Sequence, residues 1–174
     1  MRDTGFRAVT RNEAVYACTH TREFYSESVE QIPNATFQRD RDGNGRPDGW
    51  LGCDCPPEGI QAEGKHAIAI VDGSARTTIY GPEPGSNRLS LSARSTGEKP
   101  SRATLTVRAV MVGDDFIDRP EMQLVQQTRV VGKDWEVITA QVDVGRRTDR
   151  LTIRISSAPT SVLLAEPSFR RLAE

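Results

Sequence analysis

From His66 to Phe169, hydrophobic and polar residues alternate with a period of two, interrupted by Gly, Pro, Asp and Asn. Successive side chains of a β-strand point to opposite faces, so this alternation predicts strands with one buried face and one face in water. Segment 88–94 is the clearest case, with Leu89, Leu91 and Ala93 on one face. No ten-residue segment of this region has the spacing of an amphipathic helix. The pattern therefore predicts an all-β protein.

Each predicted strand has a length typical of β-strands, and turn-forming residues separate it from the next. They are 66–71, 77–80, 88–94, 102–112, 122–131, 135–144, 150–156 and 162–169. Short strands at this spacing predict a sandwich or barrel, and alternation on one face favours a sandwich of two antiparallel sheets. The predicted core consists of the inward side chains and both tryptophans: Leu89, Leu91, Leu105, Val107, Leu151, Ile153, Ile155, Trp50 and Trp135.

The length of 174 residues is typical of a single domain. Residues 1–30 carry mixed charges without alternation, so we expect a lead-in segment packed on the sandwich or a linker, with the sandwich itself spanning 31–174. The net charge of −1 argues against a general nucleic-acid binder. No apolar run approaches the roughly 20 residues of a membrane span, which argues against direct membrane insertion.

The cysteines Cys18, Cys53 and Cys55 leave one thiol over when a single disulfide forms. A bridge from Cys18 to Cys53 or to Cys55 is favoured in an exported protein, whereas the spacing matches no standard zinc site. The polar N-terminus lacks the apolar segment of a signal peptide. The chain is therefore either cytoplasmic or a fragment of a longer exported protein.

The segment 40–50 concentrates oxygen-bearing side chains in one glycine-rich loop. Its candidate calcium ligands are the side chains of Asp40, Asp42, Asn44 and Asp48 and the carbonyl of Arg46. Their alternate spacing resembles the first half of an EF-hand loop, although Leu51 stands at the twelfth position, where an EF-hand has Glu. The alternative is a turn whose Asp and Asn side chains cap their own backbone.

The segments 34–37 (Asn-Ala-Thr-Phe) and 47–50 (Pro-Asp-Gly-Trp), with the acidic loop between them, resemble the opening of bacterial carbohydrate-binding modules. The resemblance continues through 64–70, 87–94, the strand at Trp135 and the closing strand 162–169, and covers 31–172. It implies a galactose-binding-like jelly-roll β-sandwich. It also implies a non-catalytic role in holding a polysaccharide.

Two positions depart from that family's pattern. Gln38 follows Phe37 where the family commonly has Glu, and the closing strand reads Leu164-Ala-Glu166-Pro where the family commonly has Asp-Asp-Val. In the family both acids help to hold a calcium ion between the chain ends. We therefore expect the acidic loop to carry the ion here, with Glu166 able to replace one of the usual acids.

Sugar binding uses exposed aromatic faces and polar side chains that bond to hydroxyl groups. The candidate aromatics are Tyr80 and Phe116; packing under a loop is the alternative for each. The outward positions of three predicted strands carry the candidate arginines Arg94, Arg108 and Arg154. If those strands are neighbours, the arginines suit an acidic polysaccharide, because a guanidinium binds a carboxylate through two hydrogen bonds. The alternative is an ordinary solvated face.

Neither a nucleophile elbow, nor a metalloprotease motif, nor a phosphate-binding loop is present in the sequence. The carboxylates of Asp114, Asp115, Asp118 and Glu121 suit a solvated loop better than a glycosidase pair, so we expect no enzyme activity. The expected partners are an oligosaccharide or polysaccharide and a catalytic or membrane domain of the same longer chain, outside the cytoplasm. The scarcity of aromatic residues favours an alternative function, a structural domain that braces a glycan-processing or cell-envelope protein without its own sugar site.

Overall fold

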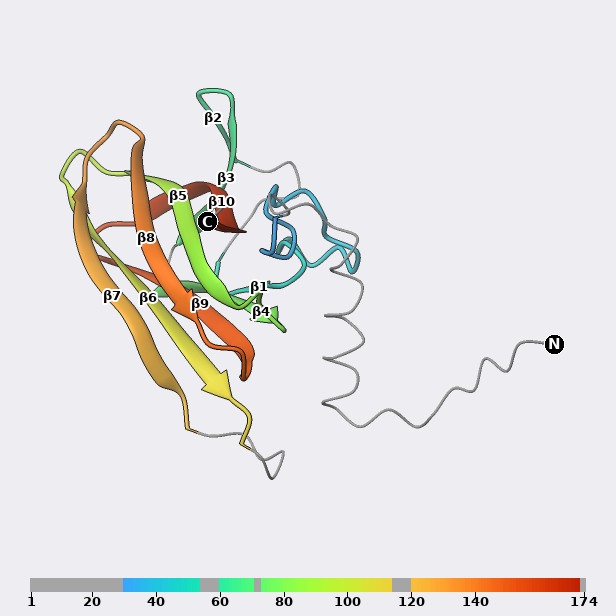
Figure 1. Cartoon of the computed structure of the whole chain (residues 1–174). Helices are drawn as coiled ribbons and strands as arrows, with labels where there is room; N and C mark the ends of the chain where they lie inside the picture. Colours follow the sequence, from blue (N-terminus) through green and yellow to red (C-terminus); the bar gives the residue numbers. More distant parts are fainter. Residues whose placement is uncertain (1–29, 54–59, 71–72, 114–119, 173–174) are drawn as a thin grey trace.

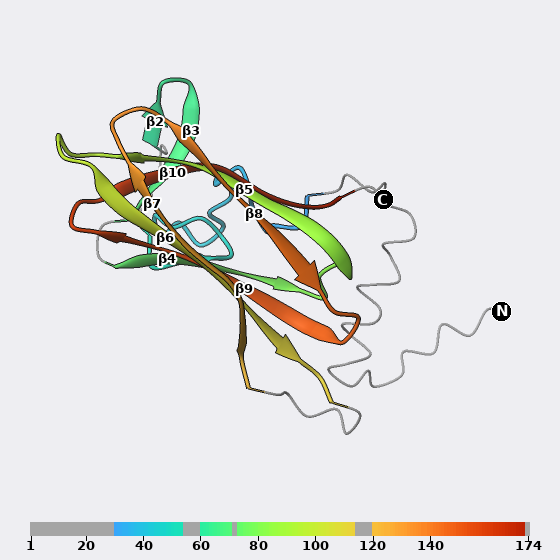
Figure 2. The same cartoon turned by 60° about the vertical axis from the view of Figure 1, so that its left-hand side comes forward.

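The computed structural model describes residues 30–53, 60–70, 73–113 and 120–172. Ten strands form two five-stranded antiparallel sheets packed face to face (Figures 1 and 2). Sheet A has the order β1 (Trp50–Leu51), β4 (Ser74–Tyr80), β9 (Thr148–Ala158), β6 (Ser101–Met111) and β7 (Met122–Val131). Sheet B has the order β2 (Ile60–Ala62), β3 (Lys65–Ile70), β10 (Val162–Arg171), β5 (Gly85–Ser95) and β8 (Glu136–Val144).

The predicted all-β sandwich of two antiparallel sheets is confirmed. All eight predicted strands are present, and the prediction for β7 agrees with the observed bounds at both ends. β1 and β2 were not predicted, because segments of two and three residues are too short to show a period. β5, β9 and β10 extend beyond the predicted segments into polar residues, where the backbone pairing of their neighbours continues.

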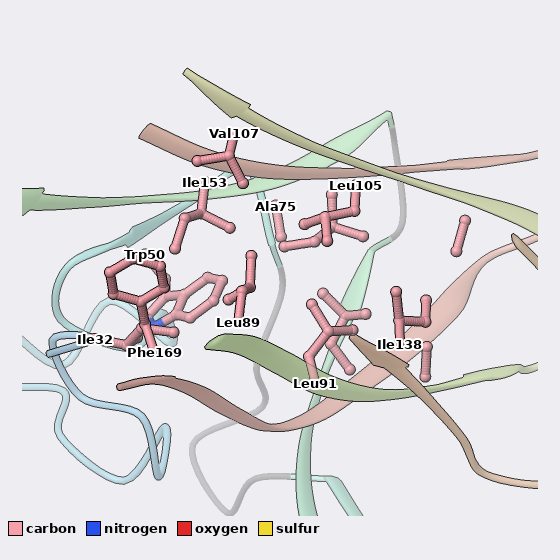
Figure 3. Packing of buried hydrophobic residues seen from close by; sticks show 14 of the residues in the cluster. Ile32, Trp50, Ala75, Leu89, Leu91, Leu105, Val107, Ile138, Ile153 and Phe169 are labelled. Atoms are coloured by element: carbon pink, nitrogen blue, oxygen red, sulfur yellow. The ribbon is translucent and has the colours of Figure 1, made fainter. Parts of the chain in front are cut away.

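The hydrophobic core lies between the two sheets (Figure 3). Val107 and Ile153 of sheet A point toward Leu89 and Leu91 of sheet B, and all four side chains are buried. The predicted inward residues of β5, β6 and β9 all belong to this core, which confirms the alternation. Burying each such side chain contributes roughly 1.5–3 kcal/mol.

The segment 30–49 closes one end of the sandwich and leads into β1. Trp50 is buried beside Phe37, with the two ring centroids 5.0 Å apart, and its indole N–H donates to the carbonyl of Pro33. The Glu30 carboxylate accepts the backbone N–H of Phe169, which ties the segment to β10. The prediction of a core position for Trp50 is confirmed, and the predicted lead-in lies almost entirely outside the described residues.

The prediction of a core position for Trp135 was wrong. Its ring packs on a small cluster of Ala67, Leu163 and Ala165, which belongs to the outer face of sheet B. Trp135 precedes the first residue of β8, so it does not take part in the alternation that directs Ile138 inward. Two alanines in this cluster leave room for the large ring on a face that is otherwise polar.

Position 105 tests the alternation directly. Leu105 has no exposed surface, whereas Val130 at an outward position of sheet A is 61% exposed. We expect Leu105→Ala to lower the free energy of unfolding by about 2–5 kcal/mol, because it leaves a cavity in the core. Val130→Ala serves as the matched control, with an expected change within about 0.5 kcal/mol. Urea unfolding followed by tryptophan fluorescence measures both, and equal effects would contradict the assigned faces.

Candidate functional site

The acidic loop (residues 40–48) is held at its base by Asn34. The Asn34 side-chain amide donates to the carbonyls of Arg39 (2.8 Å) and Asp48 (3.2 Å), and its oxygen accepts the N–H of Arg39. The N–H of Asp48 in turn donates to the carbonyl of Arg39 at 2.7 Å. One side chain therefore brings the two ends of the acidic loop together.

Within the loop, the carboxylates of Asp40, Asp42 and Asp48 converge, each offering one oxygen within 4.8 Å of the others. Gly45 has a φ of 75°, which glycine adopts without strain, and its N–H donates to Asp40 at 2.9 Å. The side-chain oxygen of Asn44 is turned into the loop, where it accepts the N–H of Arg46 at 2.8 Å. Oxygen ligands in such a turn are the kind that Ca²⁺ prefers.

The loop meets only part of an EF-hand's requirements. Its residues supply oxygens at the first, third, fifth and ninth positions, whereas the twelfth is Leu51, which lies in β1 and is exposed. Arg41 offsets some of the negative charge, since its Nε lies 3.6 Å from Asp48 at the surface. The arrangement can hold one hard cation, with water molecules completing its coordination shell.

Glu166, the predicted replacement for one of the family's acids, lies on the outer face of sheet B. It lies where the pairing of β10 with β5 is irregular, has a φ of 51°, and accepts hydrogen bonds from Lys65 and from Ser92 on the outer face of sheet B. The bond from Lys65 lowers the pKa of Glu166 below its usual value, and the Ser92 hydroxyl adds to this against an opposing effect of burial.

The outer face of sheet A brings together three of the five predicted ligand residues: Tyr80, Arg108 and Arg154. Arg154 lies directly opposite Arg76 of β4 on one side and Thr106 of β6 on the other. Two glutamines of β7 and several threonines complete this polar face. We call it the arginine face, defined by Arg76, Tyr80, Arg102, Thr106, Arg108, Gln126, Arg150 and Arg154.

Arg94 does not belong to the arginine face, because β5 is in sheet B. Its guanidinium lies over the ring of Trp135 at 5.4 Å from the centroid and is paired with Glu63 at 2.9 Å. Phe116, the fifth predicted ligand residue, lies outside the described residues, as do Asp114, Asp115, Asp118, Cys18 and Cys55. Cys53 is buried beside the core.

Sequence reasoning missed Arg76 and passed over Arg150 as ligand candidates. Arg76 lies in the part of β4 that the alternation did not include. Arg150 alternates regularly with Thr152 and Arg154 on the outward side of β9, but it was not put forward as a ligand. The direct pairing of Arg76 with Arg154 is a property of strand order, which the sequence does not encode locally. Arginine at outward positions of several strands was the available signal.

No protein-family model matches the chain, and no curated protein matches it. Solved structures do match. The CBM22-1 xylan-binding domain of Paenibacillus barcinonensis Xyn10C has a TM-score of 0.59 at 16% identity, over 84% of this chain and 99% of that chain. A CBM4 structure has a TM-score of 0.54 at 17% identity, over 81% and 99%. The TmCBM61 module in complex with β-1,4-galactotriose has a TM-score of 0.56 at 14% identity, over 83% and 100%.

These matches show the fold: the chain is a jelly-roll β-sandwich of the type found in carbohydrate-binding modules. The fold class inferred from the resemblance is therefore confirmed. Among the described residues, none belongs to a helix long and apolar enough to cross a membrane.

The pair of Lys65 and Glu166 gives a pH-dependent contribution to stability. Because folding lowers the pKa of Glu166, the contribution is present above the pKa of an unfolded Glu, about 4.3, and is lost as the pH falls through the folded value. We expect Glu166→Gln to lower Tm at pH 7 by at most about 4 °C, because the pair is largely exposed. The difference from wild type should close at pH 2.5. The exposed Glu98→Gln is the control, and a Tm difference that persists in acid would contradict the assignment.

Proposed function

We propose that the protein is a non-catalytic carbohydrate-binding module whose ligand lies on the arginine face. The fold is shared with a xylan-binding domain and with a module bound to β-1,4-galactotriose, and this supports a carbohydrate ligand. Tyr80, 62% exposed at the end of β4, supplies an aromatic surface on which a sugar ring can stack. The threonines and glutamines of the same face supply groups that bond to hydroxyls.

We infer further that the ligand is acidic. The single observation that carries this is the charge of sheet A: its five strands contain six arginines and one acidic residue, Asp149, which is buried. Like charges directly opposite each other destabilise a sheet, so the pair of Arg76 and Arg154 has a cost in the unbound protein. A carboxylate of a glycan offsets that cost by bonding to both guanidiniums.

The outer face of sheet B provides the contrast. There Arg94 is paired with Glu63, Lys65 with Glu166, and Arg170 with Glu30. Arg170 lies directly opposite Arg88, as Arg154 lies opposite Arg76, but with Glu30 3.4 Å away. These three cations of sheet B therefore have acidic partners within the chain. On the arginine face Arg108 is paired with Glu121 at 3.5 Å and Arg150 with Asp149 at 3.1 Å. The opposed pair of Arg76 and Arg154 is the one that we assign to an external carboxylate.

The test is the double variant Arg76→Gln/Arg154→Gln. We expect it to weaken binding of polygalacturonate at least tenfold, on the order of one to two charge-assisted hydrogen bonds, and to reduce the salt dependence of binding. Isothermal titration calorimetry measures both. The matched control is Arg88→Gln/Arg170→Gln, which removes the same charge from an opposed pair on sheet B and should leave the affinity nearly unchanged. Equal losses in the two variants would place the ligand elsewhere, and stronger binding of a neutral glycan by the wild type would exclude the acidic preference.

We propose a structural calcium ion in the acidic loop, held by Asp40, Asp42, Asn44, Asp48 and the carbonyl of Arg46. The convergence of three carboxylates within 4.8 Å supports it, because a bound cation neutralises charges that otherwise repel one another. The loop leads directly into β1, so the ion would stabilise the edge of sheet A.

Calcium should therefore raise the melting temperature. At free calcium about 100 times the dissociation constant, binding adds about 2.7 kcal/mol, or roughly 5–10 °C in Tm, and EDTA reverses it. Asp42→Asn should remove most of the shift, whereas the control Asp134→Asn, in the turn before β8, should keep it. A wild-type Tm that is the same in calcium and in EDTA would exclude a structural calcium ion in the acidic loop.

The alternative function, a structural domain that braces a neighbour without a sugar site, has one observation in its favour. Tyr80 is the one aromatic residue among the exposed large hydrophobic side chains of the described residues. Both carbohydrate binding and the bracing of a neighbouring domain are compatible with a module in a longer exported chain. One structural match is a chain that joins a CBM22-1 module to a GH10 module in complex with xylohexaose, of which the matched part is 29%. This supports a catalytic partner domain and a location outside the cytoplasm.

A further inference from the structure

We propose that Tyr80 and Arg150 form a subsite for one uronate residue of the glycan, and that buried Asp149 positions the guanidinium of Arg150. This inference rests on the carbohydrate-binding function proposed above, and it assigns roles to two residues outside the predicted site. Three features of β9 and its neighbours carry it: a bulge, a buried ion pair and a cross-strand pair.

The bulge lies where β9 pairs with β6. Val110 is opposite Arg150 whereas the next residue, Met111, is opposite Thr148, so Asp149 is an extra residue without a partner in β6. A bulge of this kind redirects side chains and breaks the strict alternation of faces. It explains why the side chains of two successive residues, Asp149 and Arg150, can meet.

The ion pair is largely shielded from water. The side chain of Asp149 is 2% exposed and that of Arg150 is 24% exposed, and Nη1 of Arg150 lies 3.1 Å from Oδ2 of Asp149. The other carboxylate oxygen, Oδ1, is buried without a hydrogen-bond partner. The desolvation cost of the buried Asp149 carboxylate is offset by few contacts, so the charged form depends strongly on the guanidinium of Arg150. The guanidinium is therefore held in one place, and its ordering cost is met before a ligand arrives.

Tyr80 lies directly opposite Arg150 in the adjacent strand β4, on the outer face of sheet A. Side chains opposite each other across antiparallel strands have Cβ atoms about 5 Å apart. An exposed phenol ring and a fixed guanidinium at that separation match the two parts of a uronate, a ring with an apolar face and a carboxylate attached to it. A guanidinium carries five N–H donors in a planar fork, a geometry that suits the two oxygens of a carboxylate.

The subsite lies four residues along β9 from Arg154, about 13 Å at the rise of a β-strand. A single sugar residue cannot reach both places, whereas an oligosaccharide can. The pair of Arg76 and Arg154 and the subsite at Arg150 therefore contact different residues of one acidic chain, which runs along β9.

The experiment compares the full chain with three variants on two probes, polygalacturonate and the same polymer after reduction of its carboxyl groups. We expect Asp149→Asn to weaken binding of polygalacturonate about tenfold, and Arg150→Lys, which keeps the charge but loses the planar fork, about fivefold. Neither variant should change binding of the reduced polymer. Tyr80→Ala should weaken binding of both polymers by similar factors, because stacking does not depend on the carboxylate. Calorimetry gives the affinities and thermal melting verifies folding.

The outcomes separate the subsite from the general function. If Arg76→Gln/Arg154→Gln weakens binding while Asp149→Asn and Arg150→Lys do not, the subsite is wrong and the module function stands. Equal loss on both polymers in Asp149→Asn would mean a merely structural role for Asp149 and would overturn its positioning role. If Asp149→Asn fails to fold, Arg150→Lys decides alone. Absence of binding of either polymer by the wild type would overturn the proposed function, and the subsite with it.

Discussion

The structure depends on the burial of one face of each strand against the opposite sheet. In β9 the side chains of Leu151, Ile153 and Ile155 enter the core, so the residues between them must face water. Burying the first set fixes the position of the second. Arg154 is thus held on a rigid surface by contacts that it does not make itself, and the arginine face is a consequence of how the core is packed.

Because the period of the strands was visible in the sequence, most of the fold could be predicted from it. The eight strands of four or more residues each carry enough alternation to show their inward and outward sides. Strand order was not accessible, since pairing depends on contacts between residues far apart in the chain. For this reason Arg94 and Arg154 looked equivalent in the sequence, although the structure puts them on opposite outer faces. Trp135 shows the same limit. Tryptophan is commonly buried, but because Trp135 lies just outside a strand, the alternation does not determine on which face of the sheet its ring packs.

The candidate site was predictable to a different degree in its two parts. The acidic loop is local in sequence, so the spacing of Asp40, Asp42 and Asp48 already implied their convergence. The arginine face is not local, because it combines four strands from different parts of the chain. Beneath that face, Asp149 reads in the sequence as one more polar residue at the start of β9; the bulge between Val110 and Met111 accounts for its burial.

One short strand connects the acidic loop to the arginine face. Trp50 anchors β1 in the core, and β1 pairs with β4 so that Leu51 lies opposite Arg76 and Trp50 lies opposite Thr77. The hydroxyl of Thr77 donates to the carbonyl of Gly49, directly after the loop. An ion that orders the loop would therefore restrict the edge on which β4 is paired, and with it the backbone that carries Arg76. The two proposed ligands, a cation in the acidic loop and an acidic glycan on the arginine face, would therefore act on the same strand, the first through β1 and the second through Arg76. Calcium is then expected to influence glycan affinity through the position of β4, without contacting the glycan.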